Sequence, residues 1–458
     1  MAVFSVVDLN DFHAGLIFDP EHYHPDRIAA LSRLTTNSNA TVSTYFDEII
    51  SLVSPGINDS QNDVFDLTDA LGWLLGQGEQ PGTINSTKKQ AAPGDLVISR
   101  LRSYLEEVSI IPNRKEGYSP LFSTEFITLR AKNNSGSTGW LLAFLLSSSV
   151  QTILRWSQTG SNHPRFSSRT LLGIPVPEKV YAQRMKIDAL VNSAVTVNEQ
   201  GKQLYPEAEQ ELLERIGWEA LQQSRPELFY VEELDSLNTA GRVDAEHFQP
   251  QYRRLRERLN NIGAQKIGAL CNSIAKGTQP DGYTDDGQVT VVKSKNVFGQ
   301  GIDFAGCERT NLDAYSDVPA RLSKGDVVVN ATGFGTLGRA AFIPEREEKI
   351  VASVDLVILR LNEKMILPEY ATLFLNSPAG LAQSEMFQTG SSGQLHLYPQ
   401  HIQEFLAYLP RNKNGSIDLA WQQKLADKVV AGSRAKQEAQ AKLNEAKQLV
   451  EKAIEAAG

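Results

Sequence analysis

The first half of this chain recurs in its second half, and that repeat constrains the fold more than any other feature. The stretch FDPEHYHPDRIAALSRL, which begins at Phe18, matches VDAEHFQPQYRRLRERL, which begins at Val243. Identical residues recur at one fixed offset: Asp19, Glu21, His22, Pro25 and Leu34 reappear as Asp244, Glu246, His247, Pro250 and Leu259. At the same offset, Phe4, Val6 and Leu9 recur as Phe229, Val231 and Leu234. Self-similarity of this kind predicts a duplicated architecture.

Further landmarks keep the same order in both halves. They are PGDLVIS at 93–99 and KGDVVVN at 324–330, QTGS at 158–161 and 388–391, and the proline-ended strands LLGIPVP at 171–177 and EFLAYLP at 404–410. Residues 36–92 and 262–323 share no resemblance that can be aligned. A constant frame around a variable middle suits one scaffold that presents two recognition surfaces. Loop drift after an old duplication is the alternative.

Each half combines helical and strand patterns. Helices are expected directly after Pro25 and Pro250, and again over residues 140–154 and 369–387. Runs rich in β-branched residues predict short strands at 95–99, 126–130, 290–292, 326–330 and 356–360. A Gly-Asp pair before one strand of each half fits a tight turn, because glycine tolerates positive φ. Each half is therefore expected to be an α+β domain of roughly 170 residues, an ordinary domain size.

A long helical pattern follows each domain. Its apolar positions share one face: Ile187, Leu190, Val191, Ala194 and Val195 in the first pattern, and Ala439, Leu443, Ala446, Val450 and Ala453 in the second. The second pattern lies within residues 418–457, and the spacing of its apolar residues alternates between four and three, as in a heptad seam. Gly432 is a candidate interruption of this helix. Neither stripe is apolar enough for a core, so the two helices are expected to pair antiparallel, as the repeat suggests. A C-terminal helix packed on its own domain is the alternative.

Composition limits the function classes. The apolar fraction of 41% and the charged fraction of 22% are those of a soluble globular protein. The start of the chain lacks the basic region of a signal peptide, and the cysteines, Cys271 and Cys307, fit neither a disulfide framework nor a zinc site. We therefore expect a cytoplasmic protein. The net charge of −9 argues against simple DNA binding, although residues 206–214 and 227–235 carry much of the acid.

Two motifs are weak evidence for chemistry. GFGTLG at 333–338 has the glycine spacing of a dinucleotide site, but a strand-like run follows it instead of a helix, so a β-hairpin turn is the better interpretation. EHYHP and EHFQP suggest a metal, but the second copy keeps one of the two histidines, so a capping or packing role is favoured. No methyltransferase tetrapeptide, phosphate-binding loop or nuclease cluster stands out. No catalytic, cofactor-binding or metal site is predicted in this chain.

The order of these features resembles the specificity subunit of type I restriction–modification enzymes. The resemblance rests on the Gly94-Asp95 and Gly325-Asp326 strand elements, the QTGS segments, the IPVP strand leading to a helix with Gln183-Arg184, and residues 276–303. It implies an α+β fold of two tandem homologous target-recognition domains, pseudo-twofold symmetric and separated by long helices that form an antiparallel coiled-coil spacer. The implied boundaries are target-recognition domains at 1–177 and 227–410, a central spacer region at 178–226 and a C-terminal spacer helix at 411–458.

The resemblance also implies a non-catalytic subunit that binds a bipartite duplex DNA target. Two copies of an adenine-N6 DNA methyltransferase subunit would dock on it and carry S-adenosylmethionine; whether a translocase–nuclease subunit joins them stays open. Lysine and arginine side chains would contact phosphates, while polar side chains in loops would reach base edges. The candidate DNA-binding residues are Lys88, Lys89, Arg100, Arg102, His163, Arg165, Lys276, Lys293, Lys295, Arg339, Gln394 and His396.

Two other function classes compete with this one. A protein-interaction scaffold without base readout would use the same frame and agrees with the acidic net charge. A dinucleotide-dependent enzyme would rest on GFGTLG alone. Salt-dependent affinity for duplex DNA separates a DNA reader from a scaffold, and cofactor binding by the isolated chain would support the enzyme.

Overall fold

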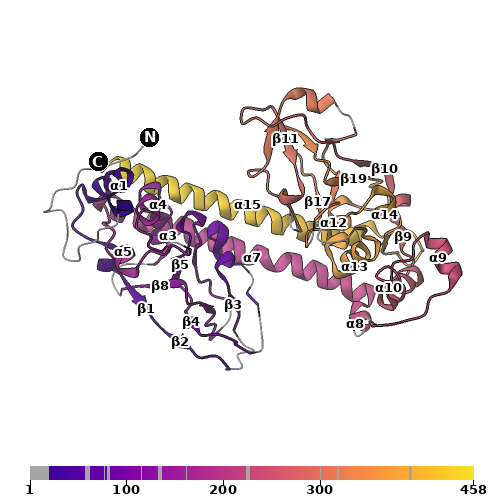
Figure 1. Ribbon diagram of the computed structural model, residues 1–458, viewed down its shortest axis with the longest axis horizontal. Helices are drawn as coiled ribbons and strands as arrows, with labels where there is room; N and C mark the ends of the chain where they lie inside the picture. The colour runs from indigo at the N-terminus through magenta and orange to yellow at the C-terminus, as the bar shows by residue number, and fades with distance from the viewer. Residues whose placement is uncertain are drawn as a thin grey trace. The chain divides into compact units, whose positions relative to one another are not determined.

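The chain folds into two units, which the computed structural model in Figure 1 shows. One unit comprises Met1–Gln200 and Ala435–Gly458, and the other comprises Gly201–Arg434. The structure describes residues 20–56, 62–76, 78–79, 83–114, 116–132, 137–160, 162–222, 227–299, 301–316, 319–333, 335–390 and 395–457. Both units are α+β, as the sequence predicts. The finer division at residues 177, 226 and 410 stays a prediction.

The first sheet of each unit has the same topology. In the first unit its strands are β1 (Phe46–Ile49), β8 (Phe126–Ala131), β5 (Leu96–Ser99) and β6 (Val108–Ile110), in that spatial order. In the second unit they are β10 (Cys271–Lys276), β19 (Leu356–Leu361), β16 (Val327–Asn330) and β17 (Ala340–Phe342). Every neighbouring pair is antiparallel in both sheets. The repeat in the sequence is therefore a repeat of this sheet.

The second sheet shows where the halves agree and where they differ. Its strands are β2 (Leu52–Val53), β4 (Lys88–Gln90), β7 (Leu121–Ser123) and β3 (Val64–Phe65) in the first unit, and β14 (Glu308–Thr310), β11 (Val289–Val292), β18 (Lys349–Ala352) and β15 (Arg321–Leu322) in the second. Strands β7 and β18 each lie between one parallel and one antiparallel neighbour. The remaining strand of each sheet, however, lies at opposite edges: β2 pairs with β4 in the first unit, whereas β14 pairs with β11 in the second. Three strands of each sheet therefore share one pairing order, β4-β7-β3 in the first unit and β15-β18-β11 in the second, although residues 36–92 and 262–323 cannot be aligned in sequence.

Helices follow the sheets in matching order. Helices α1 (Pro25–Thr35) and α10 (Pro250–Asn261) begin at the predicted prolines. Each of the two longer predicted helices is a pair: α3 (Gly139–Leu145) with α4 (Ser148–Arg155), and α12 (Pro368–Asn376) with α13 (Pro378–Phe387). The breaks have local causes, because the extended Ser147 accepts a hydrogen bond from the Val150 N–H, and Pro378 disfavours helical backbone at the residue before it.

The remaining elements are short. They are α2 (Val42–Tyr45), α5 (Ser168–Leu172), α6 (Glu178–Ala182), α8 (Trp218–Gln222), α9 (Leu234–Ala240), α11 (Ile267–Leu270) and α14 (Pro399–Gln403), strand pairs β12 (Val297–Phe298) with β13 (Gly301–Ile302) and β9 (Gln265–Lys266) with β20 (Leu406–Ala407), and the 3₁₀ turns η2 (Pro20–Tyr23), η3 (Leu67–Trp73), η4 (Ser103–Leu105), η5 (Ser294–Asn296) and η6 (Leu312–Ser316). Within the second unit, α10, α13 and α14 gather on one side (Figure 1). No helix among the described residues is long and apolar enough to cross a membrane.

Two long helices, α7 (Arg184–Ile216) and α15 (Leu419–Glu455), contribute a part to each unit. In the second unit, Lys424 pairs with Glu211 at 2.7 Å and Lys428 with Glu207 at 3.0 Å, so the two helices run antiparallel there. Helix α15 continues through Gly432, which was predicted as a candidate interruption. A side chain at Gly432 would approach the Gly201 carbonyl oxygen at 3.2 Å, so glycine allows the helices to lie close.

In the first unit the C-terminal part of α15 joins the core. Its seam residues Ala439, Leu443, Ala446, Val450 and Ala453 are buried, in one cluster with Val191 and Ala194 of α7 and with the sheet. The predicted pairing of the two stripes is confirmed. The alternative, a C-terminal helix packed on the second domain alone, is excluded because residues 435–457 belong to the first unit.

The Gly-Asp turns share one internal construction. Gly94 has φ +85° and Gly325 has φ +84°, the left-handed region that glycine tolerates. The carboxylates of Asp95 and Asp326 accept hydrogen bonds from the N–H three residues earlier, at 2.8 Å and 2.9 Å. The predicted tight turns are confirmed, and each carries a buried carboxylate directly before its strand.

Candidate nucleic-acid interface

Two of the predicted cationic residues meet in the first unit around one carboxylate. Arg100 follows β5, Glu125 precedes β8, and Arg165 lies opposite Thr159 and Leu101 in isolated bridges across the QTG turn. Glu125 accepts from Arg165 through Nε at 2.9 Å and Nη2 at 2.8 Å, and from Arg100 Nε at 2.9 Å. We call Arg100, Glu125 and Arg165 the first-unit corner.

The electrostatics of this corner fix the two guanidinium groups. Hydrogen bonds from Arg165 and then Arg100 lower the pKa of Glu125 to about 2, so it is ionised at neutral pH. Arg165 also donates from Nη1 to the His163 carbonyl oxygen at 2.9 Å. The terminal nitrogens of Arg100 make no hydrogen bond to any residue in the described part of the chain. Arg100 therefore presents an oriented fork of donors, the geometry that suits phosphate or a guanine edge.

The second unit has the same corner with other side chains. Ala331 donates its N–H to the Asp355 carbonyl oxygen at 2.8 Å, as Arg100 does to that of Glu125 at 3.1 Å. His396 lies opposite Thr389 and Thr332, as Arg165 lies opposite Thr159 and Leu101. Here the carboxylate accepts from the Thr332 hydroxyl at 3.2 Å. We call Ala331, Asp355 and His396 the second-unit corner; it keeps the acid and replaces both arginines.

A separate cationic cluster lies in the second unit. Lys293 and Lys295 both donate to Glu308, Lys295 at 2.7 Å, and the Lys293 ammonium lies 3.8 Å from the centre of the Tyr283 ring. Hydrogen bonds from these lysines lower the pKa of Glu308. The cluster is a lysine-rich surface with an aromatic neighbour, suited to backbone phosphates.

The other predicted residues are more dispersed. Lys89 is half-buried and donates to the Phe126 carbonyl oxygen at 2.6 Å, and burial lowers the pKa of its ammonium, so it supports the strand. Arg102, His163 and Lys276 are exposed. Lys88 lines a polar cavity of about 300 Å³, and Arg339 lies just before β17. Gln394 lies outside the described residues. Among the described residues, the side chains of Lys88, Lys276 and Arg339 make no hydrogen bond or ion pair with a residue of either corner.

Sequence reasoning missed the carboxylates. It sought cations, whereas Glu125, Glu308 and Asp355 position the cations or replace them. A signal was present, because an acid stands directly before FITLR in the first half and before LVILR in the second. An acid kept at matching positions of a repeat indicates a shared structural task.

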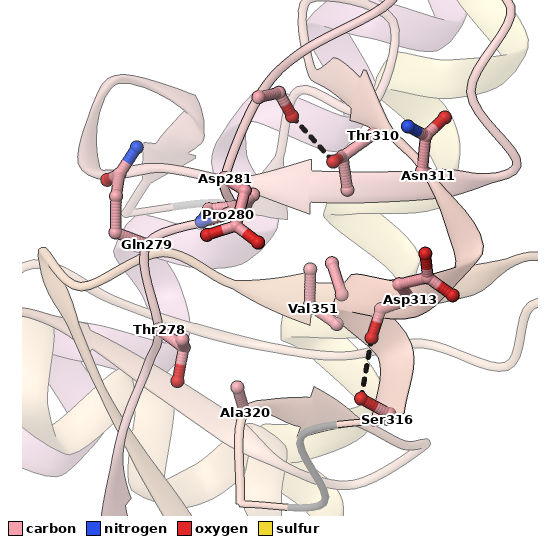
Figure 2. A pocket seen from close by; sticks show the side chains of 12 residues that line it. Thr278, Gln279, Pro280, Asp281, Thr310, Asn311, Asp313, Ser316, Ala320 and Val351 are labelled. Atoms are coloured by element: carbon pink, nitrogen blue, oxygen red, sulfur yellow. Dashed lines mark hydrogen bonds between the residues drawn. The ribbon is translucent and has the colours of Figure 1, made fainter.

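A polar cavity opens on the second sheet of the second unit, and Figure 2 shows its lining. It has a volume of about 370 Å³ between residues 278–282, β14, η6 and β18. Gln279 and Asn311 offer amide groups, while Asp281 and Asp313 offer carboxylates. Two acids disfavour a phosphate group, and amides match the donor and acceptor pattern of base edges.

The two weak motifs take structural roles. The GFGTLG segment lies in the hairpin between antiparallel β16 and β17, as predicted. Nδ1 of His24 accepts from the Asp26 N–H at 3.2 Å, and buried His247 contacts the Met386 carbonyl oxygen at 2.8 Å. The capping and packing interpretation of these histidines is confirmed. The described residues contain no group of three or more histidine, cysteine, aspartate or glutamate side chains that could hold a metal ion.

Comparison with known proteins adds structural relatives. No protein-family model matches the chain, and no curated protein matches it. The chain resembles type I S subunits. It is similar to the S subunit of a type I restriction–modification system from M. genitalium, at 12% identity and TM-score 0.45, over 93% of this chain and 98% of that one. It is also similar to the HsdS subunit from Thermoanaerobacter tengcongensis, at 14% identity and TM-score 0.26, over 90% of this chain and 96% of that one.

Proposed function

We propose that this chain is a sequence-specific DNA-binding specificity subunit that binds a bipartite duplex target. The observation that carries the proposal is the pair of matching corners, with one backbone frame and an acid in both units but arginines in only one. A scaffold that selects two different sequences needs constant positioning and variable side chains. The duplicated sheets supply the first requirement and the corners supply the second.

The chemistry of the two units supports different half-sites. Arg100 and Arg165 suit a guanine edge or phosphates, because guanidinium donors match guanine O6 and N7. At the matching place, His396 and Thr332 offer fewer hydrogen-bond donors than the two arginines, and their hydrogen bonds are weaker. The lysines on Glu308 would position the second unit on the backbone without sequence preference.

The partners in this proposal follow from the sequence resemblance. Two copies of a DNA methyltransferase subunit would be directed to the target, with S-adenosylmethionine bound by those subunits, and this chain would supply no catalytic residue and bind no cofactor. A translocase–nuclease subunit as a further partner is left to experiment. The complex would act in the cytoplasm, where the chromosome lies.

The first experiment is single-molecule methylation sequencing of DNA from cells that carry the methyltransferase with or without this chain. Loss of one bipartite methylated motif in cells without the chain is the expected result. The paired variants Arg100→Ala with Arg165→Ala, and His396→Ala alone, should each relax recognition in a different half of that motif. Each lost base contact is expected to reduce discrimination about 5- to 150-fold, from roughly 1–3 kcal/mol.

A protein-interaction scaffold is the second candidate, and the net charge of −9 favours it. The scaffold predicts no salt-dependent affinity for duplex DNA, whereas the specificity subunit predicts affinity that falls steeply with salt. An unchanged methylation pattern in cells with an active methyltransferase would reject the specificity role and favour the scaffold.

A further inference from the structure

One aromatic side chain of the first unit differs from all the others in its exposure. Tyr104 lies in η4, at the tip of the hairpin between β5 and β6, and is 64% exposed. Every other tyrosine, phenylalanine and tryptophan in the described part of the first unit is buried or partly buried. No described residue places an aromatic ring or a cation against the Tyr104 ring. Since single exposed apolar residues are common on protein surfaces, the significance of this ring depends on how the hairpin around it is built.

The backbone on both sides of Tyr104 is held in a costly conformation. Arg102 has φ +46° and Glu106 has φ +51°, so residues with side chains occupy the left-handed region at each end of η4. The hairpin between β16 and β17 has Gly333 and Gly338 at the same distances from its strands, with φ +106° and +80°. The first unit therefore makes a similar turn with side chains where glycine would be less strained. Strain of this kind at an exposed tip indicates a functional site.

The residues next to Tyr104 are fixed to the rest of the first unit. Ser103 is buried, and its hydroxyl accepts a hydrogen bond from Gln158 Nε2 at 2.6 Å; Gln158 belongs to the first QTGS segment. On the other side, Glu106 pairs with Lys447 of α15 at 3.9 Å. Because the chain is held at both places, the backbone of Tyr104 needs little ordering when a partner binds, and a preordered contact residue loses little entropy on binding.

Arginines accompany the tyrosine on this hairpin. Arg100 leads into the tip and presents the oriented fork of donors described above. Arg102 is exposed, and its side chain makes no hydrogen bond or ion pair with any described residue. Guanidinium groups bind the phosphates of DNA, while an exposed aromatic ring matches the apolar face of a base. An aromatic ring with cations beside it therefore suits a base step and its phosphates better than it suits a protein surface.

We propose that Tyr104 is a wedge, a side chain that enters one base step of the DNA bound by the first unit and unstacks it. Arg100 and Arg102 would bind phosphates beside that step, and the ring would stack on the base face that is uncovered. Pyrimidine–purine steps unstack most easily, so a step of this class is the expected target. The inference rests on the proposed function, because the first unit must bind duplex DNA for the wedge to act.

The test measures base unstacking directly. Duplexes that contain the target found by methylation sequencing carry 2-aminopurine for one adenine or pyrrolocytosine for one cytosine, at every position of the half-site except the methylated base. Both analogues fluoresce more strongly when they unstack. The complex of the full chain with its methyltransferase should raise the fluorescence at one step. Tyr104→Ala should abolish that rise and weaken binding about 5- to 150-fold, the range for loss of one stacked base. Tyr104→Phe should keep both, because the ring makes the contact.

A matched control separates the wedge from a general loss of exposed apolar surface. Ile50 lies after β1 in the same unit and is 66% exposed, so Ile50→Ala should change neither fluorescence nor affinity. Thermal stability should stay the same in all variants, since these side chains are exposed. A wild-type complex that binds the target without a rise at any step, or a rise that persists in Tyr104→Ala, would overturn the wedge and leave the proposed function standing. Equal losses in Tyr104→Phe and Tyr104→Ala would also overturn it. A wild-type complex without affinity for duplex DNA would overturn both.

Discussion

The buried carboxylates of the two Gly-Asp turns give a sharp prediction, because the units pair them unequally. The side chain of Asp95 is 2% exposed, and its carboxylate accepts hydrogen bonds from Arg130 Nε at 2.7 Å and from Arg130 Nη2 at 2.8 Å. Asp326 is 8% exposed, and its nearest contact with Arg360 is 3.7 Å. Arg360 instead donates from Nη2 to the carbonyl oxygens of Pro319 and Arg321 at 3.0 Å and 2.8 Å.

The two asparagine variants should therefore differ in stability. Asp95→Asn removes two charge-assisted hydrogen bonds, and the half-exposed arginine recovers part of the loss by hydration, so the first unit should lose about 2 kcal/mol. Burial raises the pKa of Asp326, which means that its ionised form is disfavoured in the folded unit. Asp326→Asn removes that charge and should change the second unit by less than about 0.5 kcal/mol.

Hydrogen exchange measured by mass spectrometry distinguishes these outcomes within one molecule. Peptides from β8 report on the first unit and peptides from β19 on the second. A loss of about 2 kcal/mol corresponds to exchange roughly 30-fold faster in β8 of the Asp95→Asn variant, with β19 unchanged. Equal acceleration of exchange in the two variants, each in its own unit, would refute the argument from pairing geometry.

Three further outcomes follow from single residues. Glu125→Gln should release both corner arginines and raise the affinity for non-specific duplex DNA several-fold at low salt. Fluorescence anisotropy should show a salt dependence that is steeper by about one to two phosphate contacts. Because the pKa of Glu125 is lowered to about 2, its stabilising ion pairs persist above about pH 4.5 and are lost as the pH falls towards 2. Burial lowers the pKa of His247, so the second unit should lose stability as the pH falls below the unfolded value of about 6.5, and urea titrations at pH 7.5 and 5.5 that coincide would contradict this. Gly94→Ala should destabilise by about 1 kcal/mol through its φ of +85° in thermal denaturation, whereas Gly282→Ala, in open space without positive φ, should have a smaller effect.

The sequence was sufficient to predict the duplicated frame. Matched landmarks in one order led to two sheets of identical topology, and the apolar stripe from Ala439 to Ala453 led to a buried seam. These features repeat at fixed spacing, and spacing is visible in a sequence. The break at Ser377 was also visible, since Pro378 follows it, but the break at Ser147 depends on a capping hydrogen bond that many serines do not make.

The candidate site was less accessible to sequence reasoning. Positively charged side chains were easy to select from the sequence, but Lys89 donates its hydrogen bond to a backbone carbonyl oxygen. The acid that orients Arg100 and Arg165, Glu125, lies beside another strand. Contacts between strands depend on which strands pair and in which register, and this pairing brings together residues that are far apart in the sequence. The pairing order that three strands of the second sheet share between the units could not be predicted for the same reason, because the pairing is alike while the side chains differ.

The division of α15 between the units bears on how the chain matures during synthesis. The second unit is built from one continuous stretch, Gly201–Arg434, and can close as soon as that stretch has left the ribosome. The first unit lacks Leu443, Ala446 and Val450 of its core until the end of translation. Helix α4 also lacks its cap until Glu451 is made, because the Glu451 carboxylate accepts a hydrogen bond from the Ser148 N–H at 2.6 Å. The half of the protein that is made first is therefore the last to acquire its complete core, and it spends most of translation with an apolar face uncovered.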